Sequence, residues 1–163
     1  MDTLEFRIIP AKDMIEDWMD DWTEDELNNR FLVNIFVNGT DLIDTIRDIE
    51  LPYQTAAGYP ENAGDYGHNT VEHMEWQFRE ALQPGTYSYD SGIELFCCPD
   101  CGEGGCWSVM CRFRKENGLI SMTDFHHNHR SWEYDICYRF SEENYYTEIE
   151  KMKAATEERN NHE

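Results

Sequence analysis

The chain has 163 residues and a formal net charge of −21, from 34 acidic and 13 basic side chains. A chain this acidic is repelled by nucleic-acid phosphates and by anionic membrane surfaces, so we expect neither nucleic-acid binding nor membrane association. Its aromatic content of 13% is too high for a disordered protein. The length fits one domain, which we expect to span residues 1–155 and to be followed by a polar tail at 156–163.

The N-terminal segment predicts a strand followed by an acidic helix. Residues 4–9 alternate well enough for a strand, and Pro10 ends it. Residues 13–26 contain eight acids and no base. The apolar side chains of this stretch recur every four residues, at Met14, Trp18 and Trp22. The acids are either the solvated face of an amphipathic helix or a surface that binds a partner.

A short helix and a strand are expected next. Thr23 and Glu26 have the spacing of a capping box, which predicts a helix beginning after Thr23. The apolar residues 31–37 predict a strand. Asn38-Gly39 is a strong signal for the turn that ends this strand.

Two longer helices and a loop complete the N-terminal half. Asp41 caps a helix that we expect to stop before Pro52. Residues 55–69 are rich in Gly, Ala, Asn and Pro, which predicts a long loop. The apolar spacing within 71–82 predicts another helix, which Pro84 ends.

The C-terminal half predicts strands and one final helix. We expect strands at 92–97, 106–114, 119–125 and 134–140, and a helix capped by Ser141. The fold class is therefore α+β. We expect an antiparallel sheet of about five to six strands, with helices packed on one side and a cysteine-rich turn between strands.

The sequence Cys98-Pro-Asp-Cys101-Gly102 has the form of a zinc knuckle, and Cys106 follows five residues later. Two thiolates three positions apart on a tight turn can face one metal, and thiolate-rich sites favour zinc over calcium or magnesium. The first residues lack the regions of a signal peptide, so we expect a cytoplasmic protein, in which cysteines remain thiols or metal ligands. The sequence therefore predicts one zinc ion bound by Cys98, Cys101 and Cys106.

A tetrahedral zinc site needs a fourth ligand. Residues 126–130, His-His-Asn-His-Arg, place three histidines after a predicted strand whose end can reach the knuckle. His129 is the favoured fourth ligand. The alternatives are Cys97, Cys111 and His127, with Cys137 and His126 as further candidates.

Other interpretations of these residues remain open. The C-x-x-C pair would be a redox pair if it began a helix next to a strand. The cysteines would be inert if they were buried, which suits the strand positions Cys111 and Cys137 best. The three histidines would then form only a surface loop.

Several motifs occur together in this chain. They are Cys101-Gly-Glu-x-Gly-Cys106-Trp107, Thr123-Asp124-Phe125, His129-Arg130 followed by Trp132 and Tyr134, Val37-Asn38-Gly39-Thr-Asp41-Leu42-Ile43, and Ala63-Gly64-Asp65-Tyr66. Over roughly residues 32–150, this combination resembles an uncharacterised family of small bacterial proteins. The resemblance implies no activity, but it draws attention to His129 and Arg130. Members of that family have a shorter C-x-C where this chain has Cys98-Pro-Asp-Cys101.

Three classes of function fit these features. The first is a non-enzymatic interaction protein, of the inhibitor or immunity type, with a structural zinc site and a basic protein partner. The second is a zinc-dependent, hydrolase-like enzyme with His129, Glu103 or Asp124 as acid–base groups. The third is a redox or metal sensor. We favour the first because no recognisable set of nucleophile and base is present.

Overall fold

The chain forms two antiparallel sheets and five α-helices within residues 1–161, which are the residues that the computed structural model describes. The α+β class is confirmed. The prediction of one sheet with five to six strands is wrong, because the strands divide into a three-stranded and a four-stranded sheet.

The first sheet contains the N-terminal strands in the order β1 (Leu4–Pro10), β2 (Phe31–Val37) and β3 (Thr40–Asp41). Phe6 lies opposite Ile35 in the register of β1 and β2, and both side chains are buried. Asn38 and Gly39 both have positive φ angles, of 54° and 78°. This confirms the turn between β2 and β3, since that conformation suits asparagine and glycine.

The second sheet has the order β4 (Ile93–Glu94), β5 (Val109–Glu116), β6 (Leu119–His127) and β7 (Tyr138–Ser141). Its two edge strands are shorter than expected. Beyond β4, Cys97 exchanges backbone hydrogen bonds with Gly67 of a loop rather than with a neighbouring strand. The loop therefore covers part of the sheet edge that a longer strand would have exposed.

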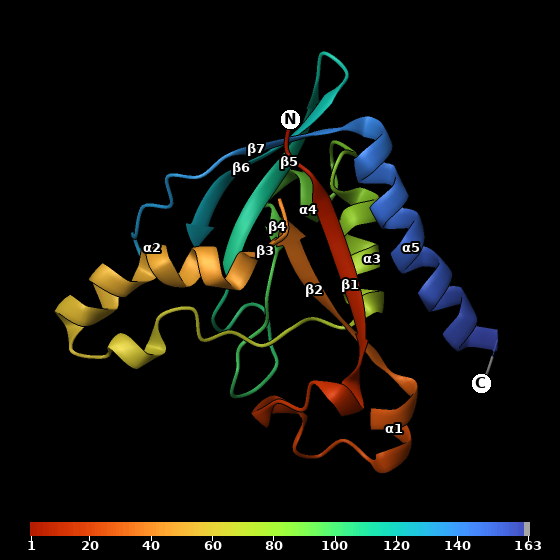
Figure 1. Ribbon diagram of the computed structural model, residues 1–163, viewed down its shortest axis with the longest axis horizontal. Coiled ribbons are helices and arrows are strands. Elements are labelled where there is room, and N and C mark those ends of the chain that lie inside the picture. Colours follow the sequence, from red (N-terminus) through yellow and green to blue (C-terminus); the bar gives the residue numbers. More distant parts are fainter. Residues whose placement is uncertain (162–163) are drawn as a thin grey trace.

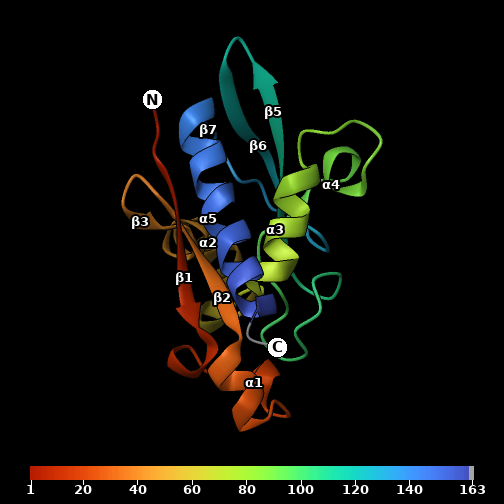
Figure 2. The ribbon, with the colours of Figure 1, turned by 90° about the vertical axis from the view of Figure 1, so that its right-hand side faces the viewer.

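The helices are α1 (Glu24–Asn29), α2 (Leu42–Ala57), α3 (Val71–Glu80), α4 (Tyr87–Asp90) and α5 (Glu142–Asn161). Helices α3 and α5 lie side by side, and α2 lies on the opposite side of the molecule (Figures 1 and 2). The helices thus flank the sheets on two sides and not on one. Helix α5 runs through residues 156–161 of the predicted tail, whose residues 162 and 163 lie outside the described part of the chain.

The predicted acidic helix with Met14, Trp18 and Trp22 on one face is wrong. The segment contains only two single 3₁₀ turns, Ala11–Asp13 and Asp17–Met19, before α1. Closely spaced acids repel one another on a helix, and the Glu16 carboxylate accepts the backbone N–H of His68. The capping box is confirmed, because the Thr23 hydroxyl accepts from the Glu26 N–H at 3.1 Å.

Helix α2 continues past Pro52 to Ala57, so the predicted end before the proline is wrong. Pro52 is exposed, and the carbonyl that loses its donor there can bond to water. Glu50 and Gln54, two polar side chains of this helix, are also buried, so the helix still packs against the rest of the protein at Gln54, beyond Pro52. Gly58, with φ of 90°, ends the helix in the left-handed conformation.

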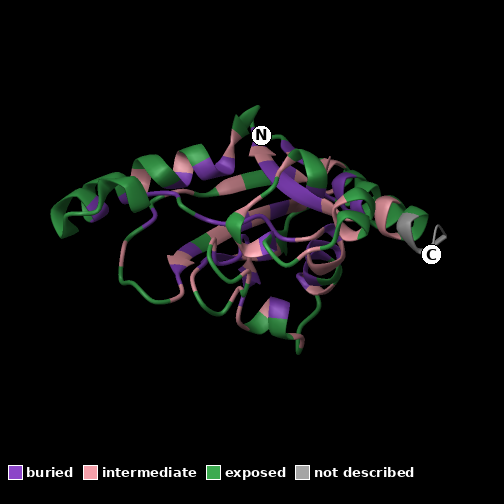
Figure 3. Ribbon diagram, turned by 90° about the horizontal axis from the view of Figure 1, so that it is seen from below, coloured by how far each residue is buried: buried purple, intermediate pink, exposed green. Residues whose placement is uncertain are grey.

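One main core joins both sheets to the helices. Phe78 of α3 contacts Phe6 of β1 at 4.9 Å and Phe113 of β5 at 5.1 Å between ring centroids. Buried residues gather along the strands and the inner faces of the helices, and the far end of α2 is exposed (Figure 3). No helix in the described part of the chain is long and apolar enough to cross a membrane.

Candidate metal centre

The loop between β4 and β5 carries the cysteine cluster and descends toward the N-terminal segment (Figure 1). At its start, Cys97 and Gly67 are joined by backbone hydrogen bonds of 2.8 and 2.9 Å. At its end, the Ser108 hydroxyl donates to the Phe96 carbonyl at 2.7 Å. The bond between Ser108 and Phe96 holds the two ends of the loop together, and the bonds between Cys97 and Gly67 tie its start to the loop that precedes α3.

Cys98, Cys101 and Cys106 form the cluster that the sequence predicts. Their Sγ atoms all lie within 4.8 Å of one another, and all three are free thiols. The Gly102 N–H donates to the Cys98 carbonyl at 2.9 Å, and the φ of 79° at Gly102 is one that glycine adopts readily. Cys98 is buried, while Cys101 and Cys106 are exposed. The three sulfurs are close enough to hold one metal ion.

The surroundings of the cluster favour a thiolate at Cys98. Burial raises the pKa of this thiol. Hydrogen bonds from the backbone N–H groups of Cys101 and Asp100 and from neighbouring thiols lower the pKa by a larger amount, so that it falls below its usual value. Hydrogen bonds with Cys98 and Cys101 raise the pKa of Cys106 to about 12. The backbone therefore stabilises a thiolate at Cys98, whereas the neighbouring sulfurs disfavour a thiolate at Cys106.

The fourth position of the site is less defined. Within the described residues, no further Cys, His, Asp or Glu atom joins the three sulfurs at this separation. His129 lies close to the loop, with its Nε2 2.9 Å from the Gly105 carbonyl oxygen. The Cys97 thiol donates to the His68 carbonyl at 3.6 Å, and Cys111 is buried within β5. His129 as the fourth ligand stays a prediction.

A cleft of about 250 Å³ opens beside the cluster. The cleft is lined by two of the cysteines, Cys98 and Cys106, and by Asn62, Asp65, Pro99, Asp100 and Trp107. Partial burial and the nearby charge of Asp100 raise the pKa of Asp65. The cleft thus favours cationic groups and disfavours anions.

Trp18 of the N-terminal segment packs against the cysteine loop, a contact that sequence reasoning missed. A Cβ atom at Gly102 would lie 2.5 Å from Cε3 of Trp18, and a Cβ atom at Gly67 would lie 2.8 Å from its Nε1. Both backbones approach the indole so closely that only glycine fits without a shift. The two glycines signal a close approach, but nothing in their spacing tells which side chain fills the space.

Glu16 joins the N-terminal segment to the loop that precedes α3. Its Oε1 accepts the backbone N–H of His68 at 2.9 Å and the indole N–H of Trp18 at 2.8 Å. Its Oε2 lies 2.8 Å from His68 Nδ1. Burial raises the pKa of Glu16, but the bonds and charge of His68 lower it more, so that it falls below its usual value. This carboxylate is therefore a structural link and is not available to a partner.

His127, an alternative ligand in the sequence prediction, is buried among aromatic rings. It is 4% exposed, and its ring centroid lies 4.1 Å from that of Trp107 and 5.1 Å from that of Trp132. Its Nδ1 accepts the His129 N–H at 3.0 Å, while its Nε2 has no hydrogen-bond partner among the described residues. The ring therefore packs as a neutral aromatic group.

The burial of His127 predicts a pH dependence of stability. Burial, together with Arg130, His129 and His126, lowers its pKa from 6.5 to about 4. Between these values the unfolded chain binds the proton and the folded chain does not, so the free energy of unfolding falls as pH falls from 6.5 to 4. Urea denaturation of a His127→Gln variant should show a weaker pH dependence over this range. A dependence equal to that of the unsubstituted protein would contradict the prediction, and His126→Gln is the matched control.

Comparisons of the chain with protein-family models, with curated proteins and with solved structures find no match. The resemblance to small bacterial proteins therefore stays a prediction. The features of the molecule that bear on its function are the cysteine cluster, the acidic cleft beside it and the N-terminal segment that packs against it.

Proposed function

We propose that this protein binds one zinc ion through Cys98, Cys101 and Cys106. The observation that carries the proposal is the approach of three free sulfur atoms to within 4.8 Å of one another. Thiolates prefer zinc, whereas calcium and magnesium take oxygen ligands. The fourth ligand would be His129, whose ring already bonds to the loop, or a water molecule from the cleft.

The contact with Trp18 supports a structural role for the zinc ion. Zinc would fix the turn that contains Gly102, and Trp18 packs directly on that glycine. A fixed turn gives the N-terminal segment a rigid support. In this proposal the metal holds the acidic N-terminal segment, residues 13–26, in place and takes no part in a reaction.

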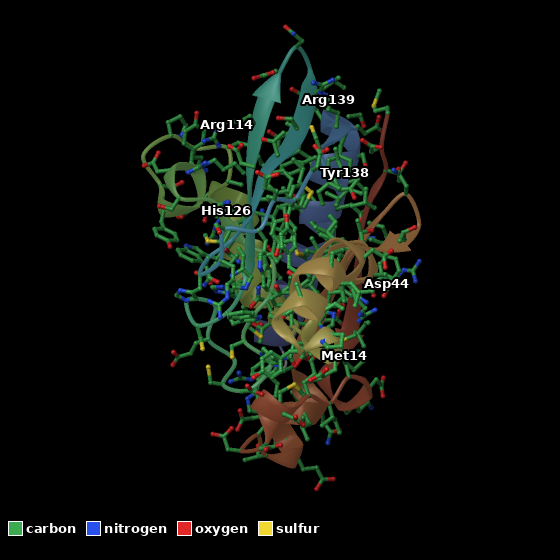
Figure 4. The ribbon with its side chains drawn as sticks, turned by 90° about the vertical axis from the view of Figure 1, so that its left-hand side faces the viewer. Met14, Asp44, Arg114, His126, Tyr138 and Arg139 are labelled. Atoms are coloured by element: carbon green, nitrogen blue, oxygen red, sulfur yellow. The ribbon has the colours of Figure 1, made fainter. Side chains whose placement is uncertain are left out.

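The charge distribution supports binding of a basic protein partner. Most of the eight acids in residues 13–26 are exposed. Met14 of this segment lies near one end of the molecule, and Arg114 and Arg139 lie near the other (Figure 4). An exposed acidic end attracts a basic protein and repels nucleic acid. We therefore propose a non-enzymatic interaction protein, of the inhibitor or immunity type.

Metal analysis tests the proposal. The purified protein should contain about one zinc ion per chain. Cys106→Ser should weaken zinc binding by about 100-fold or more, because losing a direct ligand is worse than losing an outer hydrogen-bond partner. Competition with a chromophoric chelator measures this affinity. Cys137→Ser, which removes an exposed cysteine outside the cluster, should leave it unchanged. Protein isolated without metal that also fails to bind added zinc would refute the proposal.

Removal of the metal distinguishes a structural site from a catalytic one. A ligand present at 1,000 times its Kd stabilises the folded state by about 4 kcal/mol. For a chain of this size, that corresponds to a shift in Tm on the order of 10 °C. We expect chelation to lower Tm by such an amount and to change the fluorescence of Trp18.

The acidic cleft favours a second candidate, a zinc-dependent enzyme of the hydrolase type. Asp65 lines the cleft with Cys98 and Cys106, and its raised pKa suits a group that exchanges protons. An unchanged Tm after chelation would favour this candidate over a structural site.

A further inference from the structure

Four aromatic side chains line a groove next to the acidic cleft. The groove has a volume of about 370 Å³, and its aromatic residues are Tyr53, Tyr59, Trp107 and Trp132. Tyr59 is 57% exposed and Tyr53 is 37% exposed, whereas the two tryptophans are half-buried. All four rings therefore remain partly accessible to a ligand.

Three rings of this aromatic groove, those of Tyr53, Trp107 and Trp132, hold one another in place. Tyr53 stacks on Trp132 with centroids 5.7 Å apart, and Trp107 meets Trp132 edge to face at 6.1 Å. The buried ring of His127 contacts both tryptophans. A ligand that binds here would order few side chains, so little conformational entropy would be lost on binding.

The groove also presents hydrogen-bond donors. The indole N–H groups of Trp107 and Trp132 and the hydroxyl of Tyr59 belong to its lining side chains and can donate hydrogen bonds. The Arg130 guanidinium lies 4.8 Å from the centroid of the Trp107 ring and uses one of its N–H groups on the His129 carbonyl. These donors match a ligand with unpaired carbonyl oxygens, such as a polyproline II segment, which has no internal hydrogen bonds.

The charge beside the groove selects a basic ligand. Asn62 and Trp107 line both the groove and the cleft of the cysteine cluster, so the two are adjacent. The cleft contributes Asp65 and Asp100, and Asp17 and Glu16 add negative charge near Asp65. An anionic ligand would be repelled there, whereas a lysine or arginine would be attracted.

We propose that the aromatic groove binds a proline-rich, basic segment of the partner protein in the polyproline II conformation. Proline rings pack between the tyrosine and tryptophan rings, and the indole N–H groups and the Tyr59 hydroxyl bond to the carbonyls of the segment, as in other grooves of this kind. A basic side chain of the segment reaches Asp65 and Asp100. This inference rests on the proposed function as an interaction protein and names the chemistry of its partner.

Isothermal titration of the full-length, zinc-loaded protein with three synthetic peptides of equal length tests the proposal. The first is four repeats of Pro-Pro-Arg, the second is four repeats of Gly-Ser-Arg, and the third is four repeats of Pro-Pro-Gln. The first should bind at least about tenfold more tightly than the other two, because only it has both the conformation and the charge. Its binding should weaken as salt is raised.

Two matched variants locate the binding site. Tyr59→Ala should weaken binding of the first peptide by about fivefold or more, since exposed aromatic side chains dominate such contacts. Tyr87→Ala, which removes a tyrosine that is 58% exposed in α4, should leave it within about twofold of the unsubstituted value.

The possible results distinguish a failure of the groove proposal from a failure of the proposed function. If the Gly-Ser-Arg and Pro-Pro-Arg peptides bind equally and Tyr59→Ala does not affect this binding, the groove proposal is overturned. The proposed function, binding of a basic protein by an acidic surface, is then retained. Binding of a neutral oligosaccharide such as cellohexaose, without any of the peptides, overturns both. Failure of every basic peptide to bind also overturns both, while the zinc content of the same sample still decides the metal site.

Discussion

Replacing Glu50 by alanine is expected to lower the free energy of unfolding by about 4 kcal/mol, in the range seen when one partner of a buried charged network is removed. Glu50 is fully buried in α2. Its carboxylate accepts hydrogen bonds from the Tyr66 hydroxyl, the Tyr134 hydroxyl and the Gly64 N–H. Alanine would leave these three donors in the protein interior without an acceptor.

The two tyrosines show why Glu50 holds this network together. Burial and the adjacent Glu50 carboxylate raise the pKa of both phenols well above the usual value, so both remain protonated donors. Through these bonds, α2 fixes the loop that contains Tyr66 and the segment that contains Tyr134. These segments also carry Asp65 of the cleft and Trp132 of the aromatic groove.

Urea denaturation measures the effect of the Glu50 substitution. Glu50→Gln retains the size and one acceptor oxygen, so it should lose about half as much stability as Glu50→Ala. Glu61→Ala removes an exposed carboxylate near the same loop and should change stability by no more than about 0.5 kcal/mol. A loss below about 1 kcal/mol for Glu50→Ala would contradict the role assigned to this network.

Gly102→Ala is expected to lower the free energy of unfolding by about 3 kcal/mol and to weaken zinc binding. The φ of 79° at Gly102 costs a residue with a Cβ atom about 1–2 kcal/mol. The new methyl group would also lie 2.5 Å from Cε3 of Trp18, and overpacking of this kind costs about 1–3 kcal/mol. The strain acts on the turn that joins Cys98 to Cys101.

Two other glycines separate these effects. Gly118 has a φ of 77°, and a Cβ atom added there would meet nothing within 4 Å, so Gly118→Ala measures the backbone strain alone. Gly105 lies in the cysteine loop with open space around it and without a φ in the left-handed range, so Gly105→Ala should be close to neutral. Thermal denaturation and chelator competition measure stability and zinc affinity for all three variants. Equal effects of Gly102→Ala and Gly118→Ala would show that Trp18 does not pack on the loop.

Local patterns predicted much of the secondary structure. A run of apolar residues and a two-residue Asn-Gly turn define β2 and its end, and the capping box defines the start of α1. The acidic helix expected around Met14, Trp18 and Trp22 did not form, because the four-residue apolar spacing reflects contacts with other parts of the chain. Trp18 faces Gly102 and Gly67, and Glu16 bonds to His68.

The sequence by itself determined that Cys98, Cys101 and Cys106 would lie together, because a tight turn and a glycine-rich return are local properties of eleven consecutive residues, 97–107. Only the tertiary structure decided what surrounds them. Trp18 and Asp65 reach the cluster or its cleft from separate parts of the chain. The division into two sheets was also decided there, because backbone bonds such as that between Gly67 and Cys97 depend on which distant segments meet. Spacing along one stretch of chain carries no information about such partners.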